Sequence, residues 1–276
     1  KVAEFFGGEA DERILQPYGI AVDSKGRIYV ADSAARVVHM FDPAGKEYKA
    51  IPGTKQERFK SPVGVALDPQ GRLFVSDPEL GIVLGLDGKK KAFLRISEGL
   101  RRPTGLAFSM ANNLLYVVDT AGHQILAYDL TGNLRHSFGG RGSGDGQFNF
   151  PTSITIDRQG TLYVTDSMNF RVQILAADGR FLGRFGRAGD ALGDFANPKG
   201  VAINSEGHIF VVEGLYDVVN VFDREGRLLL TFGGPGVGRG QSWLATGLFI
   251  DAADRVYLAA SFNGRIQVFQ YLRQEM

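Results

Sequence analysis

Five acidic side chains occupy one position of a recurring pattern, each at or near the end of a short apolar run. They are Asp32, Asp77, Asp119, Asp166 and Glu213. Carboxylate oxygens that converge from separate loops are typical ligands of Ca²⁺. An Asp after a strand can instead cap its own turn by accepting backbone N–H groups. Because a recurring position is typical of a structural device, whereas a functional site breaks symmetry, we expect the capping role.

A second group of oxygen donors lies near Glu213, the one glutamate of that series. It consists of Asn204, Asp217 and Asn220. Together with Glu213 these residues form an alternative calcium-binding set. No spacing among them is typical of a known metal-binding loop, so the set stays an alternative.

The four histidines are a third source of metal ligands or general bases. The sequence pattern puts His39 and His136 in strands and His208 in a turn, and only His123 lies in a loop after a second strand. A metal cluster needs its ligands side by side, so none is expected here. The chain has no cysteine, which excludes disulfides, thiolate ligands and thiol nucleophiles. We therefore predict no catalytic residue, no metal site and no cofactor.

Three long glycine-rich loops carry cations and aromatic side chains, at residues 139–148, 186–195 and 233–243. Glycine-rich loops that bind phosphate open a helix, and no helical pattern follows these. The glycines are expected to allow turns with positive φ. Phe148, Phe195 and Trp243, which end the loops, are predicted to point inward as anchors.

Arginine and aromatic side chains in these and neighbouring loops predict a binding surface, because such residues are enriched at interface hot spots. The expected partner-binding residues are Arg58, Arg102, His123, Arg141, Phe170, Arg187, Tyr216, Arg239 and Phe262.

The elements that must position all these residues form a sixfold repeat. One apolar sequence segment, seen in Pro17–Asp23 and Pro151–Asp157, recurs every 41 to 48 residues and is predicted to form a first strand. A turn and a second strand, such as Ile28–Asp32, follow it. Apolar anchors nine residues further on define a third strand, and several units then end in Phe-Gly. Such a repeat predicts an all-β, six-bladed β-propeller with four antiparallel strands per blade, forming a single domain over residues 1–276.

The last unit stops after its third strand, at Arg265–Phe269. Its missing strand is predicted at the other end of the chain, where Val2–Gly8 copies the Phe-Gly-Gly ending of other units. The N-terminal strand would then close the ring and leave no open sheet edge. A glycine opens five of the six first strands, with Ser153 as the exception, which is expected where backbones converge around an axis.

The pattern resembles the NHL-repeat family. Blade four carries the resemblance most fully, in Pro151–Asp157, Gly160–Asp166, Asn169-Phe170-Arg171 and the preceding loop. The chain is most similar to bacterial free-standing NHL propellers and to sensor domains of bacterial receptor kinases. The resemblance implies binding through the top face, which carries the loops between second and third strands and between blades. It also implies an extracytoplasmic location, in the periplasm or at the cell surface, and a protein partner such as a multihaem cytochrome or a cell-surface complex.

Charge and hydropathy limit the other function classes. The net charge is +1, from 31 basic and 30 acidic residues. The electrostatic field of the whole chain therefore does not favour the binding of nucleic acid. No apolar run is long enough for membrane insertion. The chain begins at Lys1, which favours removal of an export signal.

Together these observations favour a non-catalytic recognition scaffold, a subunit of an assembly or a sensor, that binds a protein or small ligand through its top-face loops. Two alternatives stay open. One is a calcium-dependent hydrolase acting in the channel, as in gluconolactonases, which are similar in architecture. The other is single-stranded RNA binding by the top face, as in TRIM-NHL proteins.

Overall fold

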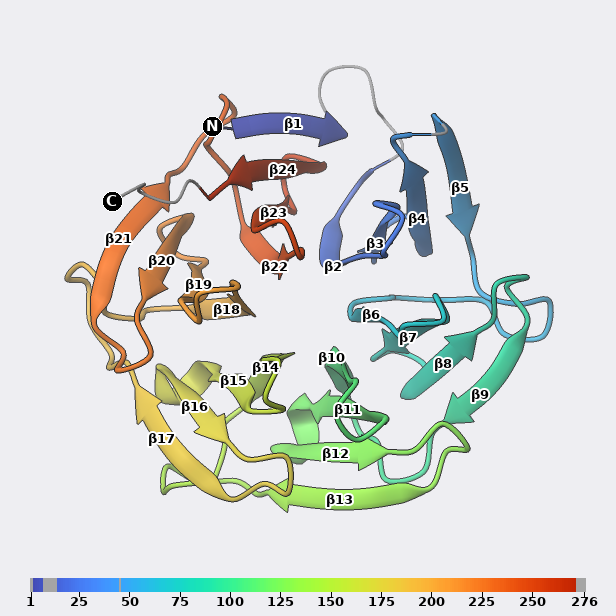
Figure 1. The fold of residues 1–276 in the computed structure, drawn as a ribbon, viewed down its shortest axis with the longest axis horizontal. Helices are drawn as coiled ribbons and strands as arrows, with labels where there is room; N and C mark the ends of the chain where they lie inside the picture. Colours follow the sequence, from blue (N-terminus) through green and yellow to red (C-terminus); the bar gives the residue numbers. More distant parts are fainter. Residues whose placement is uncertain (1, 7–13, 45, 272–276) are drawn as a thin grey trace.

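The computed structural model describes residues 2–6, 14–44 and 46–271. These residues form six four-stranded antiparallel sheets around a common axis, along which Figure 1 looks. The predicted six-bladed propeller is confirmed. In the described ranges no helix is long and apolar enough to span a membrane.

Each blade runs from an innermost strand at the axis to an outermost strand at the rim. Blades 1 to 3 contain, in this order, β2 (Pro17–Val22), β3 (Ile28–Asp32), β4 (Val37–Asp42) and β5 (Glu47–Ile51); β6 (Val65–Leu67), β7 (Leu73–Asp77), β8 (Ile82–Leu86) and β9 (Ala92–Ile96); and β10 (Pro103–Ser109), β11 (Leu114–Asp119), β12 (Gln124–Tyr128) and β13 (Leu134–Gly139). Blades 4 to 6 contain β14 (Pro151–Ile156), β15 (Leu162–Asp166), β16 (Arg171–Leu175) and β17 (Phe181–Phe185); β18 (Pro198–Ile203), β19 (Ile209–Glu213), β20 (Val218–Phe222) and β21 (Leu228–Gly233); and β22 (Ala245–Ile250), β23 (Arg255–Ala260), β24 (Arg265–Gln270) and β1 (Val2–Phe6).

The N-terminal strand closes the last blade, as predicted. Strand β1 pairs antiparallel with β24, so that Val2 lies opposite Phe269 and Glu4 lies opposite Gln267. In Figure 1 this blue strand lies outside the red β24. The ring is therefore completed by hydrogen bonds between the two ends of the chain.

The apolar core lies between the blades rather than within one centre. Each of six clusters of buried side chains joins one pair of neighbouring blades. Between blades 1 and 2, for example, Tyr29 and Met40 pack with Phe59 and Leu73. Side chains on both faces of the inner strands are thus buried, which explains why these strands read as nearly continuous apolar runs.

The glycines of the innermost strands are required by close approach to the next blade. A Cβ atom on Gly64 would lie 2.0 Å from the carbonyl oxygen of Thr104, and one on Gly247 would lie 1.6 Å from that of Tyr18. Ser153, the exception, uses its hydroxyl to accept the Val201 N–H of the next blade at 3.3 Å.

One prediction about local structure was wrong. Phe148 and Phe195 are buried anchors, whereas Trp243 is 50% exposed. The bridges Arg141–Phe148, Ala188–Phe195 and Pro235–Ser242 place buried Ser242 at the anchor position, one residue before Trp243.

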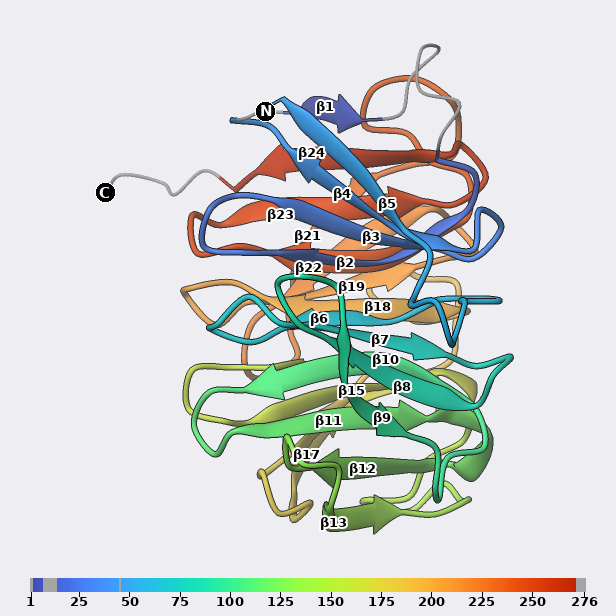
Figure 2. The ribbon, with the colours of Figure 1, turned by 90° about the vertical axis from the view of Figure 1, so that its right-hand side faces the viewer.

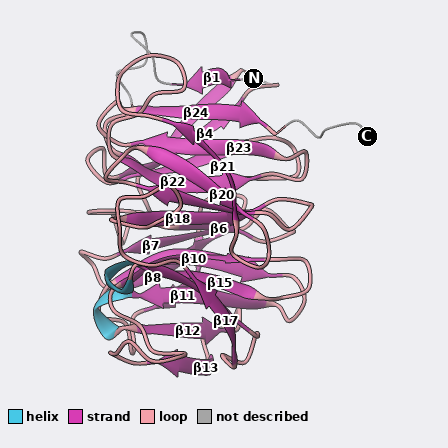
Figure 3. Cartoon of the chain, turned by 90° about the vertical axis from the view of Figure 1, so that its left-hand side faces the viewer, coloured by secondary structure: helices cyan, strands magenta, loops and turns pink. Residues whose placement is uncertain are grey.

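The top and bottom faces differ in their loops. Figure 2 shows the strands stacked as layers, with turns emerging on both sides. The two 3₁₀ turns, η1 (Thr120–Gly122) and η2 (Ser167–Asn169), follow second strands and therefore lie on the top face, at the left in Figure 3.

Candidate active site at the channel mouth

The recurring acids hold the incoming loop of their own blade. Asp32 accepts the N–H groups of Leu15 at 2.6 Å and Gln16 at 3.0 Å, and Glu213 accepts those of Ala196 and Asn197. Asp77, Asp119 and Asp166 accept equivalent loop N–H groups, and all five side chains are buried. The predicted capping of the following turn is confirmed for Asp32, Asp77 and Glu213. Asp119 and Asp166 make no such cap bond, so the role that all five share is to hold the incoming loop.

Asp32 shows how strongly such capping stabilises the charged form. Burial alone would raise the pKa of Asp32, but the His39 imidazole and the N–H groups of Ala35, Leu15 and Gln16 bond the carboxylate and keep that pKa below its usual range.

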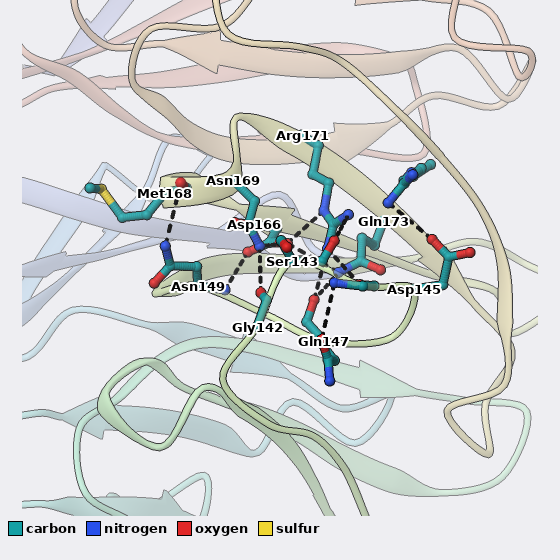
Figure 4. Close-up of polar contacts among 12 residues, drawn as sticks. Gly142, Ser143, Asp145, Gln147, Asn149, Asp166, Met168, Asn169, Arg171 and Gln173 are labelled. Carbon is teal, nitrogen blue, oxygen red and sulfur yellow. Dashed lines mark hydrogen bonds and ion pairs between the residues drawn. The ribbon is translucent and has the colours of Figure 1, made fainter.

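The Asn-x-Arg motif of blade four is also structural. Arg171 pairs with Asp166 at 2.7 Å and donates to the carbonyl oxygens of Ser143, Gly144 and Gln147. Figure 4 shows this network between the loop and the blade. Arg265 makes the equivalent bonds in blade six, to Val237, Gly238 and Gln241. These motif residues fix the shape of the blade-to-blade loops.

The four histidines are far apart in role and environment. His39 is buried between Asp32 and Tyr48, and His208 contacts Tyr271 and Asn204 in a bottom turn. His123 accepts the Phe150 N–H at 3.1 Å, and His136 lies exposed on β13. In the part of the chain that the structure describes, no three His, Cys, Asp or Glu side chains could hold one metal ion.

The alternative calcium set around Glu213 does not fit a metal. Asn204 is in a bottom turn and accepts the N–H groups of Glu206 and His208. Asp217 accepts the Ala245 N–H at 2.8 Å, and Asn220 accepts the Thr231 hydroxyl at 2.7 Å. Because their oxygens are bonded within separate elements, these residues do not converge on a shared site.

The predicted partner-binding residues are spread around the top face. Arginines 58, 102, 141, 187 and 239 are exposed, and Arg187 pairs with Asp194 at 2.7 Å. Tyr216 and Phe262 are 42% and 68% exposed. Phe170 is half-buried against the core between blades 4 and 5, and His123 is buried, so these two present little surface.

The main cavity is the axial channel, with a volume of about 650 Å³. The innermost strands line it (Figure 1). The lining can be divided into layers of six residues, one from each blade, which we call rungs. The top rung consists of the residue before the glycine or serine that opens each innermost strand, and its members are Tyr18, Val63, Thr104, Thr152, Lys199 and Thr246. The mouth above also includes Arg102, and no Asp, Glu or His lines the cavity among the residues described.

A hydroxyl clasp explains the threonines of this rung. In blade 4, the Thr152 hydroxyl contacts that of Ser167 at 2.7 Å, and Ser167 donates to the Pro198 carbonyl of the next blade at 2.9 Å. Blades 3 and 6 repeat the arrangement with Thr104 and Thr120, and with Thr246 and Ser261. The clasp joins a blade to its neighbour and is a structural feature of the repeat.

Blades 1, 2 and 5 depart from the clasp. Blade 1 has Tyr18 in place of the threonine, and blade 2 has Val63 and Pro78 at the two positions. Blade 5 also differs at both positions, and there an ionisable side chain enters. Lys199 replaces the threonine, and Gly214 replaces the second hydroxyl residue. A Cβ on Gly214 would lie 3.1 Å from Cγ of Lys199, so the glycine makes room for the lysine. Burial lowers the pKa of Lys199, and the nearby Glu213 carboxylate opposes that shift only in part. A lysine of lowered pKa is typical of catalytic sites.

Tyr18 of blade 1 adds a second ionisable group to the rung. Burial raises the pKa of Tyr18, and the positive charge of Arg102 opposes the shift. The hydroxyl therefore stays protonated at neutral pH and can donate a hydrogen bond. Lys199, Tyr18 and Arg102 come from blades 5, 1 and 3 and line the same cavity mouth.

Sequence reasoning missed this site. Lys199, Tyr18 and Gly214 are not among the residues for which the sequence pattern predicts a role. The signal was available in a comparison of the six repeats position by position, where lysine and glycine replace hydroxyl residues in the same blade.

Comparison with known proteins supports the fold and changes the functional expectation. Residues 54–186 match the family model described as "SMP-30/Gluconolactonase/LRE-like region". No curated protein matches the chain significantly.

Similar solved structures cover almost the whole chain. A streptogramin B lyase matches with a TM-score of 0.71 and 13% identity, over 97% of this chain and 96% of that one. Virginiamycin B lyase from Staphylococcus aureus gives 0.69 and 13%, over 99% and 89%. Hydrazine synthase from Kuenenia stuttgartiensis gives 0.66 and 14%, over 98% and 99%. Identities this low show a shared fold alone.

The prediction that this chain is not an enzyme is contradicted. The matching model is partly named for gluconolactonase, and two of the similar folds belong to lyases. The error arose because the repeat pattern reports on the fold, whereas activity depends on the few positions that leave the pattern. The resemblance to NHL repeats in particular stays a prediction. What is established is a six-bladed β-propeller in which residues 54–186 match the SMP-30/gluconolactonase/LRE-like model.

Proposed function

We propose that this protein is an enzyme of the hydrolase or lyase type, that its substrate binds in the top mouth of the axial channel, and that Lys199 is its general base. The observation that carries the proposal is the paired departure of Lys199 and Gly214 from the hydroxyl clasp. A half-buried cation at a position that forms a structural bond in three other blades, with space opened for it, is hard to explain as a structural residue alone.

The chemistry of the mouth supports proton abstraction. A neutral Lys199 amine can accept a proton from an attacking water in hydrolysis, or from a carbon next to a carbonyl group in a lyase reaction. Negative charge then develops on a substrate oxygen in either reaction. The Arg102 guanidinium and the Tyr18 hydroxyl are the donors at the mouth that could stabilise this charge.

No step is assigned to calcium. The oxygen donors of the alternative calcium set are bonded to backbone and side-chain groups of separate elements, as described above. The hydrolase part of that alternative is retained here, with chain residues in place of the metal.

The proposal can be tested by assaying the purified protein on aldono-lactones, aliphatic lactones, aryl esters and streptogramin B. Lactone opening is monitored through the protons that it releases, and the lyase reaction is monitored through the change in absorbance. For any substrate that is turned over, Lys199→Met should lower kcat/KM by about 100-fold or more, because it removes the base but keeps the side-chain volume. Lys25→Met, in an exposed bottom turn, is the matched control. Equal activity of Lys199→Met and wild type would refute the role of Lys199.

A partner-binding role of the top face is the second candidate, and it is compatible with catalysis. It is favoured by the exposure of Tyr216, Trp243 and Phe262 on top-face loops, since isolated aromatic side chains of this kind anchor interfaces. We propose it together with the extracytoplasmic location. The test is whether Phe262→Ser weakens capture of a protein from the native source while the melting temperature stays unchanged.

A further inference from the structure

The charges at the mouth of the channel have one sign. Arg102 and Lys199 line the cavity, and no carboxylate or imidazole lines it among the described residues. The nearest recurring acids belong to second strands, one strand away from the axis. Their oxygens are bonded to loop N–H groups, as Glu213 is to Ala196 and Asn197. A ligand at the mouth therefore meets two cations and, among the lining residues, no carboxylate.

Below the mouth the lining is apolar. The middle and lower rungs consist of Ile20, Val65, Leu106, Ile154, Val201 and Leu248, and of Val22, Leu67, Phe108, Ile156, Ile203 and Ile250. Thr155 is the one polar side chain added to these rungs. At about 3.3 Å per strand residue, the apolar part extends roughly 13 Å below Tyr18.

These two features select one kind of ligand. A fully hydrophilic ion would leave the apolar rungs unfilled, and a neutral hydrocarbon would place no anion beside Arg102 and Lys199 in the cavity. We infer that the channel binds an amphiphilic organic anion, with its acid group between Lys199 and Arg102 and its apolar chain along the lower rungs. The inference goes beyond the proposed function: an anion binds the protonated Lys199, whereas a general base acts in its neutral form, so such a ligand is expected to compete with the substrate at the mouth.

Binding can be measured without knowledge of the reaction. Isothermal titration of the purified chain with decanoate, decanol and decyltrimethylammonium, all below their micelle concentrations, separates the contributions of charge and chain. Decanoate is expected to bind, decanol at least about tenfold more weakly, and the cation not measurably, because a hydrogen bond to a charged group contributes about 1.5–3 kcal/mol. Butyrate should bind more weakly than decanoate, since it buries less apolar surface.

Variants test each end of the site. Lys199→Met and Arg102→Gln should each weaken decanoate at least about tenfold and leave decanol unchanged. Ile203→Gln, in the lower rung, should weaken decanoate and not butyrate. Lys25→Met is the control, and the melting temperature of each variant verifies folding. If decanoate fails to bind, if decanol or the cation binds as tightly, or if Lys199→Met has no effect, the inference is wrong.

The outcome is independent of turnover. If decanoate binds as described but no substrate is turned over, the ligand class stands and the proposed enzyme fails. If neutral lactones are turned over through Lys199 while decanoate neither binds nor inhibits, the enzyme stands and the ligand class fails.

Discussion

Lys199 and Gly214 show how a site can be made within a repeat by two substitutions. The clasp residues of blades 3, 4 and 6 are bonded to each other and to the next blade. In blade 5, Lys199 stands in place of the first clasp residue, and Gly214, which has no side chain, stands in place of the second. At the scale of single residues, function is therefore read from the positions where one copy differs from its equivalents.

The pH dependence of the reaction should follow Lys199. A general base acts in its neutral form, so kcat/KM is expected to rise with pH, with a midpoint below the ordinary lysine pKa of 10.5 because burial lowers the pKa of Lys199. Glu213 raises that pKa, so Glu213→Gln should move the rising limb to lower pH. A pH–rate profile of both proteins measures the shift, and a limb that stays in place or moves upward would contradict the role of Lys199.

Gly214→Ser should reduce activity with little loss of stability. The new Cβ would lie 3.1 Å from Lys199 Cγ and force the lysine to move, while the hydroxyl restores a clasp residue. Thr120→Gly in blade 3 is the reciprocal change, which removes a clasp bond to Pro151, two blades away from the proposed base. It should lower the melting temperature and keep kcat/KM. A loss of stability with full activity in Gly214→Ser would argue that the glycine serves folding only.

At the scale of elements, the loops between blades are held by a few buried polar groups. Arg171 joins Asp166 to three carbonyl oxygens of one loop, and both charged side chains are almost fully buried. The loops are therefore rigid supports at the top face despite their glycine content.

Replacing Arg171 with Met should destabilise the protein by about 3–5 kcal/mol, because the Asp166 carboxylate would be left buried without its charged partner. Urea unfolding provides the measurement, and Arg180→Met, an exposed arginine of the same blade, is the control. A loss below about 1 kcal/mol would mean that other donors, such as Asn169 and Gln173, suffice.

Much of the element order could be predicted from the sequence because each strand recurs six times with the same partners. The repeat fixed the blades, the closing strand and the capping acids. It failed where one copy differs locally, as at Trp243, where Ser242 takes the anchor position. The candidate site lay outside the prediction because Lys199 and Tyr18 are far apart in the sequence and line one cavity only once the ring is formed.

At the scale of the whole molecule, stability depends on closing the ring. Strand β1 supplies the outer edge of blade 6. Deleting residues 1–6 should lower the melting temperature and promote association, because β24 would become an exposed edge. Differential scanning calorimetry and size-exclusion chromatography follow these effects, and an unchanged monomer with an unchanged transition would show that the closing strand is dispensable.

The pairing of Val2 with Phe269 also sets an order of events during synthesis. Strand β1 is synthesised before its partner β24, so it stays unpaired while the strands between them are made. Its docking then joins the most distant contacts of the chain, which are the slowest to form. The ring therefore closes only after β24 has been synthesised, and a chain that is truncated before β24 cannot form the closed ring.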